Sequence, residues 1–266
     1  MKGRVLIVAG SDSGGGAGIQ ADIKTVTALG GYAATAITAL TAQNTQGVFG
    51  IVPVEPGFVR RQMEAVLGDI GADCIKTGML HDAAIIAAVA DCLEAMNPSL
   101  PRVIDPVMLS TSGARLLDPA AVAALRDRLI RRATVLTPNI PEAEALLGRR
   151  IPDIEGMEPA AQSLRALGAR IVVLKGGHMA GDTVRDVVVD DGERYVLESP
   201  RIATRHTHGT GCTLASAIAT GLAQGMAPRA AIERAHAFVQ QAIRTAPGLG
   251  QGHGPLNHAH GIIDER

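Results

Sequence analysis

The 266-residue sequence contains no tryptophan, two tyrosines, three phenylalanines and three cysteines, and its formal net charge is only −1. So few aromatic rings cannot form a base-stacking surface, and no basic excess is present to bind phosphates, which argues against nucleic-acid partners. Cys74, Cys92 and Cys212 show no CxxC or Cys/His zinc spacing, which indicates reduced thiols and a cytoplasmic protein. The opening apolar run is too short for a membrane span or a signal peptide, so no membrane partner is expected.

What the sequence does contain is a regular alternation of β-branched runs and helical apolar spacing. This alternation predicts an α/β fold: one doubly wound, mostly parallel sheet with helices on both faces, covering residues 1–266 as a single domain. The expected strands are 4–9, 32–40, 73–77, 102–104, 133–137 and 170–175, followed by a hairpin over 184–198. The expected helices are 19–29, 58–67, 81–96, 119–129, 141–147, 158–167, 209–223 and 229–246.

Polar residues and glycines follow the ends of most of these strands. Ligands of such sheets bind beyond the carboxyl ends of the strands, so one edge of the sheet is the candidate site. The segments that would meet there are 10–18, 43–44, 76–79, 105–106, 139–144, 175–178 and 209–212.

The segment HGTGCT, residues 208–213, is the first candidate motif. Its glycines let successive backbone N–H groups point inward, and the helix that begins there adds free N–H groups, which together favour an anion. We expect this field to lower the pKa of the Cys212 thiol. The alternative is a glycine turn before a core helix in which the cysteine is a small apolar residue.

The segment GSDSGGGAG, residues 10–18, is not a P-loop, because no Lys-Ser/Thr pair follows at the required spacing. It is not the dinucleotide-binding GxGxxG either, because Ile19 stands where glycine would be needed. It allows a substrate to approach the backbone closely, or it is simply a flexible turn.

Three charged residues follow strand ends. Asp105 and Glu142 could hold Mg²⁺, which usually takes one or two carboxylates, or Glu142 could only cap a helix. Lys175 could reach a phosphate or could be a solvated residue at the end of a strand. His206 and His208 lack partners at metal-ligand spacing, so we interpret them as surface or loop residues.

Taken together, the motifs TPNIPEAEAL (137–146) and HGTGCTLASAIA (208–219) resemble the ribokinase-like superfamily. AGSDSGGGAGIQADIKT (9–25), ALTAQNTQGV (39–48), IKTGML (75–80), IDPVM (104–108) and VLKGGH (173–178) occur in the order typical of the hydroxymethylpyrimidine/phosphomethylpyrimidine kinases of thiamine biosynthesis. The resemblance extends from residue 4 to about residue 260 and implies a three-layer α/β/α kinase fold.

The resemblance also implies roles for individual residues. Gly209, Thr210 and Gly211 match the anion hole around the transferred phosphate, and Cys212 stands where most sugar kinases of the superfamily carry a catalytic aspartate. Gln43 matches the glutamine that reads the aminopyrimidine edge. The remaining pyrimidine contacts would be Asp22, Gly10, Met79 and Val107; ATP would contact Asn139, Lys175 and Thr183; and Asp105 and Glu142 would hold the metal.

The implied activity is ATP- and Mg²⁺-dependent phosphorylation of 4-amino-5-hydroxymethyl-2-methylpyrimidine to its monophosphate and then its diphosphate, by a homodimer whose interface could use the hairpin 184–198. A pyridoxal or pyridoxine kinase is the nearest alternative, although Gln43 favours the aminopyrimidine because pyridoxal lacks the exocyclic amine. A binding module would show a damaged anion hole or missing acids, and neither is found. A cysteine hydrolase would need a positioned histidine base, and no pattern supports one.

Overall fold

The computed structural model describes residues 1–262, and at its centre is a nine-stranded sheet in the order β3-β2-β1-β4-β5-β6-β7-β8-β9. β1, β2, β4, β5, β6 and β7 are parallel, whereas β3 and β8 run antiparallel to their neighbours, which confirms the mostly parallel sheet. The strands are β1 (Arg4–Asp12), β2 (Tyr32–Asn44), β3 (Gly47–Pro53), β4 (Cys74–Thr77), β5 (Arg102–Ile104), β6 (Val135–Leu136), β7 (Ile171–Leu174), β8 (Thr183–Val189) and β9 (Arg194–Pro200).

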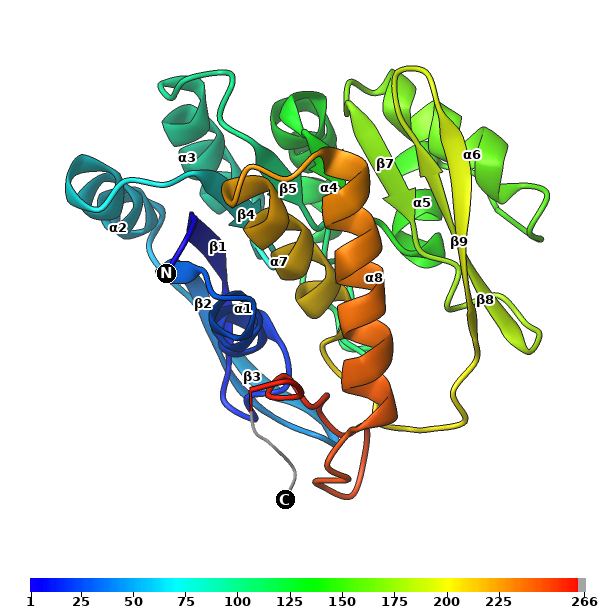
Figure 1. The fold of residues 1–266 in the computed structure, drawn as a ribbon. Helices are drawn as coiled ribbons and strands as arrows, with labels where there is room; N and C mark the ends of the chain where they lie inside the picture. Colours follow the sequence, from blue (N-terminus) through cyan, green and yellow to red (C-terminus); the bar gives the residue numbers. More distant parts are fainter. Residues whose placement is uncertain (263–266) are drawn as a thin grey trace.

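Helices cover both faces of the sheet (Figure 1). On one face α1 (Gly18–Ala28), α7 (Thr210–Ala223) and α8 (Pro228–Arg244) form one apolar core with the strands. On the other face lie α2 (Pro56–Asp69), α3 (Ala83–Glu94), α4 (Val122–Ala124), α5 (Ile140–Leu147) and α6 (Met157–Ala166). With almost no aromatic residues, both cores are filled by Ala, Val, Ile and Leu, and the interior of β1 is inaccessible to solvent.

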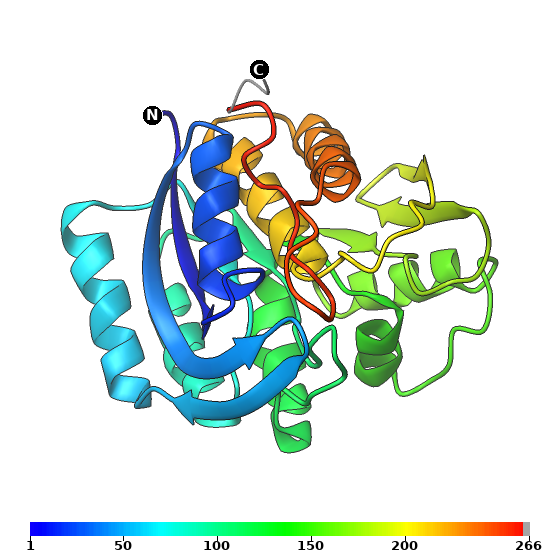
Figure 2. The ribbon, with the colours of Figure 1, turned by 90° about the horizontal axis from the view of Figure 1, so that it is seen from below.

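Two elements differ from the prediction. β3 was not expected; it pairs with an extended β2 to form a hairpin at the edge of the sheet (Figure 2). The expected helix 119–129 is present, but its hydrogen-bond spacing changes along its length: 3₁₀ turns at Pro119–Ala121 and Ile130–Arg132 enclose α4 and a π turn at Leu125–Leu129. The π turn lets Leu125 and Ile130, five residues apart, both face the core.

The chain after α8 returns to the carboxyl edge of the sheet and packs against the β2–β3 hairpin and the loop before α7 (Figure 2). The backbone N–H of His253 donates to the carbonyl of Thr45 at 2.8 Å, and that of His208 donates to Gly254 at 3.1 Å. This C-terminal segment therefore lies against the β2–β3 hairpin and the loop before α7 and holds the two together.

Candidate active site

A cavity of about 770 Å³ lies at the carboxyl edge of the parallel strands. The strand topology brings residues from seven separate segments to this cavity, as the sequence predicted. The predicted site residues that line it are Gly10, Gln43, Met79, Asp105, Val107, Asn139, Glu142, Lys175, Gly209, Thr210, Gly211 and Cys212.

Glycine is required at Gly209, the residue directly before α7. Gly209 has φ +86°, and a Cβ there would lie 1.9 Å from the carbonyl oxygen of Gly16. A Cβ on Gly211 would lie 3.1 Å from Nζ of Lys175. Because α7 begins at Thr210, the N–H groups of Gly211 and Cys212 have no intrahelical acceptor and can bind an anion.

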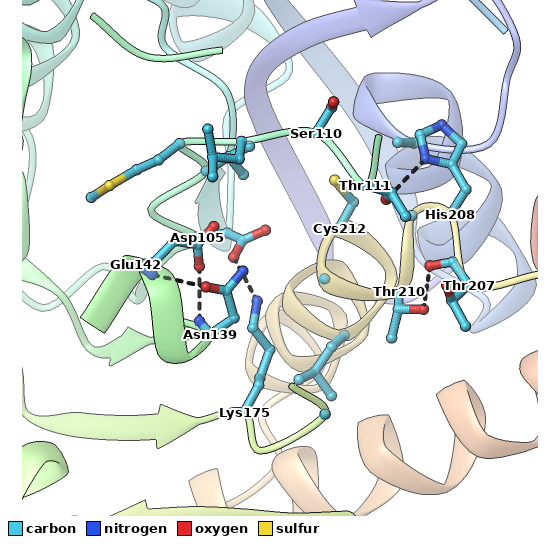
Figure 3. A pocket seen from close by; sticks show the side chains of 18 of the residues that line it. Asp105, Ser110, Thr111, Asn139, Glu142, Lys175, Thr207, His208, Thr210 and Cys212 are labelled. Atoms are coloured by element: carbon cyan, nitrogen blue, oxygen red, sulfur yellow. Dashed lines mark hydrogen bonds and ion pairs between the residues drawn. The ribbon is translucent and has the colours of Figure 1, made fainter. Parts of the chain in front are cut away.

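Cys212 lies in the first turn of α7, beside Asp105 and Lys175 (Figure 3). The lowered pKa expected from the helix N-terminus is wrong: burial raises the pKa of the Cys212 thiol to about 12, although Lys76 partly opposes the shift. Desolvation of a thiolate therefore outweighs the field of the helix in the free protein.

Lys175 and Asp105 form an ion pair at the centre of the cavity. Nζ of Lys175 donates to Oδ1 of Asp105 at 3.2 Å, and the hydroxyl of Thr137 donates to the same oxygen at 3.1 Å. Burial alone would lower the pKa of Lys175, but Asp105 and Glu142 raise it above its usual value. Lys175 is therefore a fixed ammonium that faces the anion-binding loop.

Asn139 and Glu142 form a reciprocal cap at the start of α5 (Figure 3). The N–H of Glu142 donates to Oδ1 of Asn139 at 2.9 Å, and the N–H of Asn139 donates to Oε2 of Glu142 at 2.8 Å. Burial and the neighbouring Asp105 raise the pKa of Glu142 to about 7, while Lys175 opposes them. The capping interpretation is thus confirmed, and the same carboxyl group also lines the cavity.

The two acids can hold a metal only together with a ligand. Within residues 1–262, no three His, Cys, Asp or Glu side chains gather as a metal-binding cluster. Mg²⁺ is commonly held by one or two carboxylates, water and substrate phosphates, so Asp105 and Glu142 fit that mode. Burial is the main cause of the raised pKa of Glu142 and Asp105 adds to it, so a cation between the two acids would favour the ionised form of Glu142.

Two expected ligand contacts do not reach the cavity. Asp22 is fully buried, and both of its carboxylate oxygens lie 2.8 Å from Nζ of Lys76. The assignment of Asp22 to the pyrimidine has no support from the cavity lining, because α1 directs this side chain toward β4 and α7. Thr183 also lies outside the cavity lining, whereas its neighbour Val184 lines it, as the alternation of side chains along β8 requires.

Sequence reasoning missed the role of His208. It lies in a loop, as one of the two expectations had it, but it is buried and not at the surface. Its Nε2 lies 2.9 Å from Oδ2 of Asp12 and 3.0 Å from Nε2 of Gln43. Its Nδ1 lies 3.2 Å from the Thr111 hydroxyl (Figure 3). The position of His208 directly before Gly209 was the available signal, because a side chain there must lie beside the anion-binding loop.

No helix within residues 1–262 combines the length and the apolar character that a membrane span needs. Cys74, Cys92 and Cys212 are free thiols, as expected.

Known proteins match this chain over nearly its full length. The sequence profile of the phosphomethylpyrimidine kinase family matches residues 12–257. The hydroxymethylpyrimidine/phosphomethylpyrimidine kinase of Streptomyces coelicolor is 48% identical over 256 residues, which is 96% of this chain and 93% of that protein. The thiamine biosynthesis bifunctional protein ThiED of Geobacter sulfurreducens is 54% identical over all 266 residues, and the chain spans about half (54%) of its length.

Solved structures extend this similarity. The pyridoxal kinase of Bacillus subtilis in complex with ADP is 36% identical with a TM-score of 0.90, covering 99% of this chain and 100% of that one. The phosphomethylpyrimidine kinase of Clostridium difficile is 40% identical with a TM-score of 0.81, covering 91% and 100%. Because the family profile matches nearly the full length of the chain, the chain belongs to the phosphomethylpyrimidine kinase family.

Proposed function

We propose that the protein transfers the γ-phosphoryl group of ATP to the hydroxymethyl oxygen of 4-amino-5-hydroxymethyl-2-methylpyrimidine, and then phosphorylates the monophosphate to the diphosphate. The observation that carries this proposal is the single cavity in which the anion-binding loop, Lys175 and Gln43 meet. The loop suits a transferred phosphoryl group and Gln43 suits an aminopyrimidine, because its amide both accepts and donates hydrogen bonds.

Phosphoryl transfer depends on positioning and on charge stabilisation. The free N–H groups of Gly211 and Cys212 and the ammonium of Lys175 would hold the γ-phosphoryl oxygens as charge develops on them. Cys212 would orient the hydroxymethyl oxygen; with its raised pKa the thiol is neutral before ligands bind. As the bond from the hydroxymethyl oxygen to the γ-phosphorus forms, the bond from that phosphorus to the β-phosphate oxygen breaks and ADP leaves, while the hydroxyl proton passes to an oxygen of the transferred phosphoryl group.

Mg²⁺ would be held by Asp105 and Glu142, together with phosphate oxygens and water, and would neutralise charge on the triphosphate. Asn139 holds Glu142 in place through the cap of α5. The nucleotide would lie next to Lys175 and Asn139, which both line the cavity. The earlier assignment of Thr183 to ATP lacks this support.

The test is mass spectrometry of the products formed from Mg-ATP and the aminopyrimidine, with pyridoxal in a parallel reaction. Monophosphate followed by diphosphate would support both steps. Monophosphate alone would remove the second step. No phosphorylated pyrimidine would refute the proposal.

A pyridoxal kinase is the second candidate, because pyridoxal kinase structures match this fold at 36% identity and a TM-score of 0.90. Pyridoxal also carries a hydroxymethyl group on a six-membered heteroaromatic ring. Phosphate on pyridoxal alone would favour this candidate and would show that the interpretation of Gln43 is wrong.

We also propose a cytoplasmic homodimer. The β2–β3 hairpin leaves Leu40, Phe49 and Val52 exposed, and Leu40 and Val52 are paired in register. On the hairpin 184–198, which we first considered for the interface, Val196 is the exposed large apolar residue. The hairpin at the sheet edge is therefore the better supported interface. Sedimentation of wild-type protein and Phe49→Lys would test it, and an unchanged association state in the variant would count against it.

A further inference from the structure

The hydrogen bonds around Gln43 restrict how its side-chain amide can be oriented. As placed, the amide nitrogen Nε2 lies 3.0 Å from Nε2 of His208, and the amide oxygen Oε1 lies 3.4 Å from the hydroxyl of Thr41; the orientation inferred below is the reverse of this placement. All three residues line the cavity. The oxygen and nitrogen of an amide exchange places by a half turn, so the neighbours decide which end faces which residue.

The first neighbour, His208, offers a donor, and its single Nε2 hydrogen would be shared between Asp12 and Gln43. Its Nε2 lies 2.9 Å from Oδ2 of Asp12. Asp12 is an ionised carboxylate: although burial opposes it, hydrogen bonds from His208 and from the backbone N–H groups of Ala17 and Gly14 lower its pKa. A carboxylate only accepts, so Nε2 must carry hydrogen in both the neutral and the protonated imidazole. Nδ1 then accepts from, or donates to, Thr111.

The second neighbour, Thr41, offers an acceptor. Its hydroxyl donates to the carbonyl oxygen of Ser11 at 2.9 Å, which uses its single hydrogen. Toward Gln43 the Thr41 oxygen can therefore only accept. With the amide nitrogen of Gln43 facing His208, two donors would oppose each other at one end and two acceptors at the other.

We infer that Gln43 is locked with its Oε1 toward the Nε2–H of His208 and its Nε2 toward Thr41, and that His208, Asp12 and Thr41 are positioning residues for substrate specificity. The inference rests on the proposed function. The amide oxygen then accepts one hydrogen bond from the protein and can accept a second from the ligand. The amide nitrogen donates one hydrogen to Thr41 and can donate the other to the ligand. The positions of the acceptor and the donor that face the ligand are therefore fixed.

This fixed order distinguishes two pyrimidines of nearly equal shape. The 4-amino edge presents an N–H donor beside a ring-nitrogen acceptor, which matches the locked amide. The 4-oxo counterpart presents an acceptor beside a ring N–H, which is the reverse. A glutamine that rotates freely can form both hydrogen bonds with either edge. A locked glutamine can form neither with the oxo edge. Sites built on such hydrogen bonds reject mismatched analogues by about 10⁴-fold.

The kinetic test compares kcat/KM for 4-amino- and 4-oxo-5-hydroxymethyl-2-methylpyrimidine in wild type, Thr41→Val and the matched control Thr41→Ser. Valine removes the acceptor at one end of the amide while His208 still restrains the other end, so we expect the amino-over-oxo preference to fall by up to about tenfold, whereas serine retains it. An equal preference in Thr41→Val and wild type would overturn the inference. A general structural defect would lower both rates and leave their ratio unchanged.

A second measurement does not depend on turnover. The ¹⁵N NMR signals of His208, assigned by comparison with His208→Gln, report which ring nitrogen carries hydrogen. Hydrogen on Nε2 supports the lock, and a bare Nε2 overturns it. Should the wild-type protein phosphorylate neither pyrimidine, the proposed function fails, while this measurement still tests the Nε2 hydrogen that the lock requires.

Discussion

Replacing Lys76 with methionine would remove one half of an ion pair that has no access to solvent. Lys76 and Asp22 are both fully buried, and Nζ lies 2.8 Å from each carboxylate oxygen of Asp22. The hydroxyl of Ser216 also donates to Asp22, at 2.6 Å. Breaking such a pair leaves an uncompensated buried charge and typically costs about 3–5 kcal/mol. For a chain of this length, that loss corresponds to a fall in Tm of roughly 5–9 °C.

The double variant Lys76→Met/Asp22→Leu removes both charges, and we expect it to recover at least half of the lost stability, because replacing a whole buried pair is often neutral. Urea denaturation of the wild type, both single variants and the double variant gives the coupling directly. Because Asp22 does not line the cavity, Asp22→Asn should lower stability and leave the KM for the pyrimidine unchanged. A Lys76→Met loss below about 1 kcal/mol, or a raised KM in a fully stable Asp22→Asn, would refute this reasoning.

Three further predictions concern the cavity. Gly209→Ala places a Cβ against the carbonyl of Gly16, so we expect kcat to fall by about 10²-fold or more; steady-state kinetics retaining wild-type turnover would contradict the anion-binding role. Cys212 has a raised pKa, so its alkylation by iodoacetamide in the free protein should be slow at pH 7. The rate should increase only above the pH range in which an ordinary thiol ionises. A rate that already increases below pH 8 would show that the pKa of Cys212 is not raised. Glu142 ionises as the pH rises through about 7, so the affinity for Mg²⁺ should increase over that range. Glu142→Gln should raise the Mg²⁺ requirement and remove that increase, and an unchanged Mg²⁺ titration would exclude Glu142 as a ligand.

The parallel part of the sheet could be predicted because its strands are buried on both faces. Continuous β-branched runs such as that of β1 identify such strands without a pattern of alternation. β3 was missed because its sequence contains two glycines and a proline and its residues are half-exposed or exposed. It therefore shows neither a continuous β-branched run nor a regular alternation of apolar and polar residues. Its strand conformation comes from pairing with β2, which is a tertiary effect. The prediction that residues 1–266 form one domain stays a prediction, and its last four residues lie outside the described chain.

The sequence also predicted which edge of the sheet forms the site, because parallel strands end at the same edge. It could not predict the direction of each side chain. Asp22 follows the glycine loop closely, yet on α1 a few residues decide whether a side chain faces the cavity or the core. His208 shows the reverse error: its partners, Asp12 and Gln43, are 196 and 165 residues away and come together only in the fold.

Cys212 shows why local sequence cannot fix the chemistry of a site residue. The helix N-terminus that should stabilise a thiolate is visible in the sequence, whereas the desolvation that opposes it comes from packing against distant segments. Lys76 and Asp22 contribute opposite effects to the pKa of Cys212, so a buried pair that does not line the cavity still acts on the thiol. Removing Lys76 alone should therefore raise the pKa of Cys212 further, whereas Asp22→Asn should lower it. The pH dependence of Cys212 alkylation in these two variants measures both changes in the pKa of Cys212. If the pKa changed in the same direction in both variants, Cys212 would be responding to unfolding and not to the two charges.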